Sequence, residues 1–200
     1  MNRLPLAISV ARLAAAPIIA ILILWGDDAF FAASTPVTRW AYGAALALFL
    51  AAAAADLLDT VLARKLNAAS PLGGALDRAA GLALTACTLL ALAKTSLSFD
   101  LTIAAVLIVA RDTMIAGLRE GLALSGRPLP AGQGGKLQPV AVWLGCGCAL
   151  AAQSLIYFSL PVEVIGWLLT IARGALWAGA ALAVITGARY ARDAFAKPAA

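Results

Sequence analysis

The sequence predicts an all-α, polytopic membrane protein: a single bundle of six transmembrane helices that takes in residues 1–200. Composition gives the first reason, because 63% of the residues are hydrophobic and only 12% are charged, against roughly 45–50% and about 25% in soluble domains. Six apolar runs give the second, since each is near or above the roughly 20 residues that a bilayer requires. The runs are Leu4 to Trp25, Trp40 to Ala63, Leu72 to Ala93, Leu101 to Leu124, Leu137 to Phe158 and Val162 to Tyr190.

The first run has some features of a cleavable signal peptide. Arg3 precedes it, and the small residues Ala14 to Ala16 lie inside it. Arg12 interrupts the run, however, and five more runs follow. We therefore expect a helix of the mature protein.

Turn-forming residues separate the runs, and small residues lie within them. The turn signals are Gly26 to Asp28, Ser34 to Pro36, Asn67 to Pro71, Ser96 to Asp100, Gly126 to Gly135 and Ser159 to Pro161. Gly145, Gly147 and the alanines from Ala51 to Ala55 predict close approach of neighbouring helices. Aromatic residues near the run ends, among them Trp25, Trp40, Tyr157 and Tyr190, are expected to anchor the helices at the membrane interface.

Basic residues gather on one side of the predicted bundle. With six spans both chain ends share that side, which carries Arg3, Arg12, Arg64, Lys65, Arg119, Arg127, Lys136, Arg189, Arg192 and Lys197. The positive-inside rule then predicts cytoplasmic termini, and cytoplasmic loops around residues 65–71 and 125–135, in a bacterial-type inner (cytoplasmic) membrane. The net charge of +5 accordingly indicates topology and anionic lipid headgroups, with no nucleic-acid partner.

Three carboxylates stand where the pattern predicts membrane helices. Asp56 and Asp59 are three residues apart on one helix face, and the next helix returns antiparallel after a short loop, bringing Asp77 opposite. Ionisable residues inside membrane helices usually have a functional role, because burying their charge there is costly. The chain has no His, so a metal here would be a hard, oxygen-bound ion such as Mg²⁺ or Mn²⁺. A carboxylate–arginine network with Arg64 and Arg78 is the competing interpretation.

The stretch from Asp56 to Gly81 resembles the signature of the CDP-alcohol phosphatidyltransferases. That signature reads Asp, two residues, Asp-Gly, two residues, Ala-Arg, eight residues, Gly, three residues, Asp, three residues, Asp. Six of its positions are kept, namely Asp56, Asp59, Ala63, Arg64, Gly73 and Asp77. Thr60 replaces the first glycine and Gly81 replaces the last aspartate. The resemblance implies a six-helix membrane fold, usually dimeric, with a cytoplasm-facing cavity.

Further residues resemble the phosphatidylglycerolphosphate synthase branch of this family. Its amino-terminal Pro, Thr, Arg, Pro pattern is echoed by Pro5, Ser9, Arg12 and Pro17, with Leu6 in place of the usual Asn. Its Arg-Glu, Leu-Arg-Glu and Gly-Lys elements are matched by Arg111-Asp112, Leu118-Arg119-Glu120 and Gly135-Lys136. Gln138 stands where the branch has a second lysine.

The resemblance implies roles for these residues. Asp56, Asp59 and Asp77 would hold the metal; Ala63 and Gly73 would let the cytidine nucleotide approach, and Arg64 would face its phosphates. Arg111, Arg119 and Lys136 would bind the phosphate of glycerol 3-phosphate. Independently of the family, Arg111 and Arg119 are eight residues apart, about two helical turns, and so share a face. The alternative is that they pair with Asp112 and Glu120, or extend to the interface.

The family reaction displaces CMP from a CDP-linked lipid by an alcohol, and its last motif aspartate is held to be the general base and a ligand of the second metal ion. Gly81 can serve as neither, so no catalytic residue is assigned with certainty. One hypothesis is a CDP-diacylglycerol–glycerol-3-phosphate phosphatidyltransferase of phospholipid biosynthesis, forming phosphatidylglycerolphosphate and CMP. The other is an inactive pseudoenzyme that serves as a lipid-binding or scaffolding subunit, as a homodimer or with other membrane proteins. A channel or transporter is disfavoured because the charges cluster at the cytoplasmic side.

Overall fold

The computed structural model describes residues 3–31, 35–66, 71–95, 99–124, 137–156 and 161–195, and nearly all of them are helical. The helices are α1 (Arg3–Phe31), α2 (Thr35–Leu66), α3 (Pro71–Thr95), α4 (Phe99–Leu124), α5 (Leu137–Leu155) and α6 (Val162–Phe195). The predicted all-α class is therefore confirmed.

Five of the six helices are long and apolar enough to cross a membrane, which confirms a multi-pass membrane protein. The exception among the described helices is α5, with 19 residues. Gln138 and Gln153 lie near its two ends and lower its hydropathy. At about 1.5 Å per residue, α5 is roughly as long as the hydrocarbon layer is thick. The last part of its predicted run, residues 157–158, lies outside the described residues.

One predicted turn is wrong, since Gly26 to Asp28 continue α1 as helix. Gly26 packs tightly on α2 there: a Cβ on it would lie 3.0 Å from Tyr42 Cε2. This contact holds the helix together past the glycine. The prolines at the other predicted turns behave as expected, because α2 begins at Thr35-Pro36 and α3 begins at Pro71.

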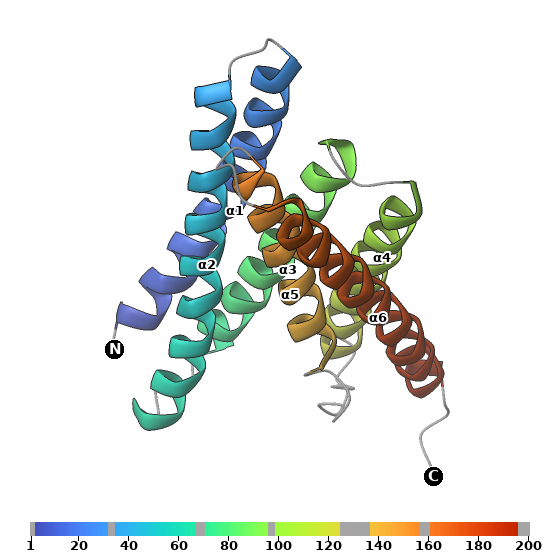
Figure 1. Ribbon diagram of the computed structural model, residues 1–200. Helices are drawn as coiled ribbons and strands as arrows, with labels where there is room; N and C mark the ends of the chain where they lie inside the picture. Colours follow the sequence, from blue (N-terminus) through green and yellow to red (C-terminus); the bar gives the residue numbers. More distant parts are fainter. Residues whose placement is uncertain are drawn as a thin grey trace.

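The helices pack in two groups, which meet where α5 lies against α2 and where α4 lies against α3. α1 lies against α2 and α3, while α6 lies against α4 and α5, and α5 also contacts α2 (Figure 1). Small residues bring α5 and α6 together, as predicted for Gly145: a Cβ there would lie 2.7 Å from Leu176 Cγ. Gly179 faces Val142 in the same way, at 2.8 Å.

The core between the helices is apolar, and its largest members include Ile19, Phe49, Leu84, Ile108 and Leu176, each at most 1% exposed. One charged side chain, Arg12, is buried among them at 2% exposure. The first residues of α1 and the last of α6 lie at the same end of the bundle, toward which α2 and α4 also run (Figure 1). That end holds the candidate site.

Candidate functional site

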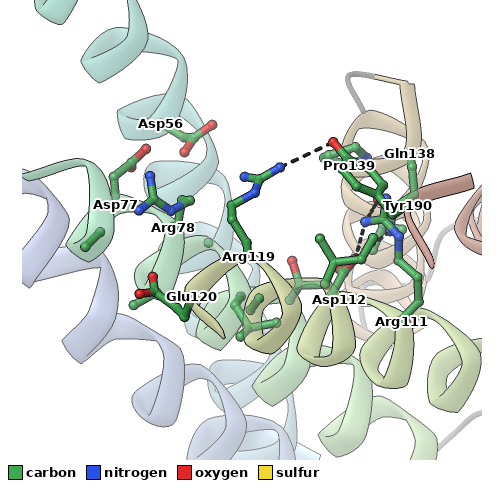
Figure 2. Close-up of a pocket in the computed structure, with 18 of the residues that line it drawn as sticks. Asp56, Asp77, Arg78, Arg111, Asp112, Arg119, Glu120, Gln138, Pro139 and Tyr190 are labelled. Carbon is green, nitrogen blue, oxygen red and sulfur yellow. Dashed lines mark hydrogen bonds and ion pairs between the residues drawn. The ribbon is translucent and has the colours of Figure 1, made fainter. Parts of the chain in front are cut away.

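A cavity of about 480 Å³ opens between the helices. Its wall takes Asp56 from α2, residues 75–85 of α3, residues 111–120 of α4, residues 138–143 of α5 and Tyr190 from α6. Figure 2 shows its polar residues in two groups, with Arg119 between them. We refer to Asp56, Asp77 and Gly81, with Arg12 behind them, as the carboxylate half. The arginine half comprises Arg111, Asp112, Arg119, Gln138 and Tyr190.

In the carboxylate half, two acids from different helices meet one buried arginine of α1. Arg12 Nη1 donates to Asp77 Oδ1 at 2.6 Å, and Arg12 Nη2 forms an ion pair with Asp56 Oδ1. Arg12 is 2% exposed, whereas Asp56 and Asp77 are 26% and 44% exposed. The carboxylates therefore face the cavity, and the guanidinium lies in the wall behind them.

Gly81 lies one helical turn after Asp77 and faces the same guanidinium. A Cβ built on Gly81 would have Arg12 Nη2 as its nearest neighbour, at 4.0 Å. Gly81 also lines the cavity. A side chain at position 81 would therefore enter the space where Arg12, Asp56 and Asp77 meet.

The described residues do not fit a pair of metal ions. No group of three or more metal-ligating side chains forms among them, and Gly81 has no ligand atom. The two acids that do converge are already bridged by Arg12. Asp59, the third predicted ligand, lies in α2, but its side chain is outside the described part of the structure. Its place in the site stays a prediction.

In the arginine half, neighbouring side chains hold Arg111 in a fixed position. Its Nη1 donates to Asp112 Oδ1 at 2.7 Å and to Gln138 Oε1 at 3.0 Å, and its Nη2 donates to Thr186 Oγ1 at 2.8 Å. Gln138 is buried and also donates to Asp112 Oδ1, at 3.3 Å. Three helices thus fix the guanidinium at the cavity wall.

Tyr190 connects the two arginines. Its hydroxyl accepts a hydrogen bond from Arg119 Nη2 at 3.3 Å, drawn as a dashed line in Figure 2. Its ring centroid lies 5.8 Å from Arg119 Cζ and 5.9 Å from Arg111 Cζ, within cation–π range. The ring therefore holds two like charges near each other.

The structure places four predicted site residues in the wall of one cavity: Asp56, Asp77, Arg111 and Arg119. Gly73 is half-buried in the first turn of α3 and is not part of that wall. Ala63 and Arg64 lie in α2 with side chains outside the described residues, and Lys136 lies outside them entirely. The roles of all these residues stay predictions.

The alternative pairings from the sequence are settled in part. Arg111 does pair with Asp112, while also lining the cavity, and Arg119 bonds to Tyr190. A carboxylate–arginine network exists, but its described cation is Arg12. Arg78 is exposed and makes no ion pair with another described residue.

Sequence reasoning missed two features of this site. Arg12 was noted as a motif residue but not as the partner of the acids, because 65 positions separate it from Asp77. Tyr190 was expected to anchor the helix at the membrane interface, but its place in the cavity wall was not predicted. A signal was present: Thr186 and Tyr190 are four residues apart, so they share the helix face that meets Arg111.

The fold and the cavity define a multi-pass membrane protein with a charged site between its helices. Comparison of sequences gives the family: the CDP-alcohol phosphatidyltransferase family model matches residues 2–186, so the chain belongs to that family. The predicted resemblance is confirmed.

Three curated relatives carry the name CDP-diacylglycerol–glycerol-3-phosphate 3-phosphatidyltransferase. The Bacillus subtilis (strain 168) protein is 32% identical over 196 residues, covering 95% of this chain and 94% of that one. The Rickettsia bellii (strain RML369-C) protein is 31% identical over 192 residues, covering 94% and 93%. A chloroplastic/mitochondrial relative from Arabidopsis thaliana is 30% identical over 203 residues, covering 94% and 62%.

Proposed function

We propose that this protein binds CDP-diacylglycerol and glycerol 3-phosphate in its cavity and transfers the phosphatidyl group, forming phosphatidylglycerolphosphate and CMP. One observation carries the proposal: a single cavity brings the motif acids of α2 and α3 together with the two arginines of α4. The names of the relatives support the choice of substrates.

The arginine half supplies a site for the acceptor's phosphate. A guanidinium presents a planar fork of donors that suits phosphate oxygens. Asp112, Gln138 and Thr186 hold Arg111 in place, so little side-chain freedom remains to be lost on binding. Within the arginine half, Arg119 extends toward the carboxylate half (Figure 2) and would contact a phosphate group near either half.

The carboxylate half is where this chain departs from its family. In the transfer, the acceptor hydroxyl oxygen bonds to the lipid-linked phosphorus, CMP leaves, and the hydroxyl proton must go to a base. Gly81 offers none, and the described acids nearest to it are paired with Arg12. A positioned general base contributes about 10²–10⁴ in rate. We therefore expect turnover to be slower by about that factor than with a base in place.

A second candidate is a pseudoenzyme, a lipid-binding or scaffolding subunit of a membrane complex. The specific observation behind it is the same half-site: glycine at position 81, and two acids engaged by a buried arginine. The arginine half would still bind its ligand in such a protein. Binding and turnover therefore separate the two candidates.

Three further points belong to the proposal. We place the protein in the inner (cytoplasmic) membrane with both termini and the cavity on the cytoplasmic side, as the distribution of basic residues favours. We expect a homodimer or a heteromer with other membrane proteins. Mg²⁺ or Mn²⁺, with Asp59 completing the ligands of Asp56 and Asp77, is the expected cofactor.

The test uses purified protein in detergent micelles. Incorporation of radiolabelled glycerol 3-phosphate into lipid is measured with CDP-diacylglycerol and Mg²⁺ or Mn²⁺, beside calorimetric binding of glycerol 3-phosphate. The control is Arg173→Gln, because Arg173 pairs with Asp100 and neither residue lines the cavity. Turnover that is lost in Arg111→Gln and kept in Arg173→Gln would establish the enzyme. Binding without turnover would establish the pseudoenzyme. If the protein shows neither binding nor turnover, both candidates are refuted.

A further inference from the structure

Arg78, near the start of α3, is a cation of the cavity wall that has no role so far. It is exposed and makes no ion pair with another described residue. A Cβ built on Gly74 would lie 3.5 Å from Arg78 Nη1, so the side chain extends back toward the first turn of α3. The guanidinium is therefore available to a ligand at the end of the bundle that holds the site.

Two of the arginines at the cavity are engaged by acids. Arg12 and Arg111 each form ion pairs with aspartates. Arg119 instead donates to the hydroxyl of Tyr190, which is neutral, at 3.3 Å. Within the described helices, Arg78 and Arg119 are therefore the arginines of the wall whose charge no acid compensates.

One acid of the wall, Glu120, likewise makes no ion pair with another described residue. It is exposed and follows Arg119 directly on α4. Successive residues of a helix do not face each other, so Glu120 does not cover the guanidinium of its neighbour. Two uncompensated arginines against one acid leave this part of the cavity with a positive balance, which favours an anionic ligand.

The arrangement fits a diphosphate. Arg78 comes from α3, beside Asp77, and Arg119 extends from α4 toward that half of the cavity (Figure 2). Each guanidinium presents a planar fork of donors that suits phosphate oxygens, and a diphosphate offers two phosphate groups for two forks. The cavity, at about 480 Å³, is within the range of about 300–1,000 Å³ that is usual for small-molecule sites.

We propose that Arg78, together with Arg119, binds the diphosphate of the CDP-linked lipid donor. Position 78 is one of the three unspecified residues between signature positions 77 and 81, and the resemblance assigns the nucleotide phosphates to Arg64. The inference rests on the proposed function for the identity of the donor, and it adds a substrate-binding residue to it. It does not require transfer, because binding alone is measured.

The test measures calorimetric binding of cytidine diphosphate, a soluble probe that carries a diphosphate, to the purified protein in detergent with Mg²⁺. We expect Arg78→Gln to weaken this binding about tenfold, through the loss of a charge-assisted hydrogen bond, and to leave the affinity for glycerol 3-phosphate unchanged. Arg78→Lys should lose less, because lysine keeps the charge without the fork. Arg173→Gln removes a charge outside the cavity and should change neither affinity.

An unchanged affinity for cytidine diphosphate in Arg78→Gln would overturn the proposal. An equal loss for glycerol 3-phosphate would overturn it too, because it would show a general loss of positive potential. Lipid headgroups are the other source of phosphate for an arginine near a helix end, so thermal unfolding is also measured with and without phosphatidylglycerol. If Arg78→Gln loses stabilisation by phosphatidylglycerol and keeps its affinity for cytidine diphosphate, Arg78 binds headgroups instead.

Failure of this inference and failure of the proposed function give different results. If the unmodified protein binds cytidine diphosphate and turns over, and Arg78→Gln binds equally well, only the inference is refuted. If the unmodified protein binds without turnover and Arg78→Gln binds more weakly, the inference stands and transfer is refuted. If the unmodified protein does not bind cytidine diphosphate, both are refuted.

Discussion

The two halves of the cavity satisfy their charges in opposite ways. In the carboxylate half one buried arginine pairs with two acids from different helices. In the arginine half Arg111 has one acid, one amide and one hydroxyl as partners, and two of these are neutral. The first half therefore groups two acids around one cation, and the second groups three acceptors around one cation. Under the proposed function, the half that we expect to bind the acceptor keeps its basic residues, while the half that we expect to perform the chemistry has glycine at position 81.

The largest expected effect is from Arg111→Gln, which removes the best-anchored cation. A hydrogen bond to a charged group contributes roughly 1.5–3 kcal/mol, or about 10- to 150-fold in affinity. We expect glycerol 3-phosphate affinity, measured by calorimetry, to fall by that factor. Mn²⁺ binding, measured by electron paramagnetic resonance, should stay the same, because the described partners of Arg111 all lie outside the carboxylate half. A fall in both would show that the halves are coupled.

Gly145→Ala should damage the arginine half through helix packing. Its Cβ would lie 2.7 Å from Leu176 Cγ and 3.3 Å from the Ala172 carbonyl oxygen, so α5 and α6 must shift apart. Overpacking of this kind costs about 1–3 kcal/mol. Thermal unfolding in detergent should show the loss. Gly166→Ala is the matched control, since nothing lies within 4 Å of its Cβ, and we expect it to be neutral or stabilising by up to about 1 kcal/mol.

Gln138→Leu should loosen Arg111 without removing it. The substitution deletes a bond from Arg111 and a bond to Asp112, at a cost of about 1–2 kcal/mol. We expect a lower unfolding temperature and weaker glycerol 3-phosphate binding. Gln153→Leu makes the same change in the same helix and should have neither effect. If Gln138→Leu and Gln153→Leu lose the same stability and affinity, these losses come from the changed hydropathy of α5 and not from the bonds of Gln138.

Tyr190→Phe should have the smallest effect. It removes the hydroxyl that accepts from Arg119 at 3.3 Å and keeps the ring beside both guanidiniums. We expect KM for glycerol 3-phosphate to rise by no more than about fivefold, which corresponds to about 1 kcal/mol. Tyr190→Leu, which also removes the ring, should cost more. If Tyr190→Phe raises KM by more than about fivefold, the hydroxyl itself contacts substrate.

The sequence predicted the fold from hydrophobic runs because bilayer thickness constrains helix length so strongly. It also predicted four residues of the cavity wall, because charged residues such as Asp56 and Asp77 are costly in a membrane helix and therefore usually functional. It could not supply the partner of those acids. Arg12 reaches them through tertiary packing between α1, α2 and α3, and local spacing does not encode that contact. The course of α1 through Gly26 has the same origin, in packing against Tyr42.

The ion pairs of Arg12 also bear on how the protein enters the membrane. The ribosome makes α1 first, and an arginine inside a single membrane helix carries an insertion cost, which reaches roughly 2.5–3.5 kcal/mol at the helix centre on insertion scales. Both acids that offset this cost come later, and Asp77 follows by 65 positions. The insertion cost of Arg12 in the first helix is therefore fully offset only after the third helix has been inserted.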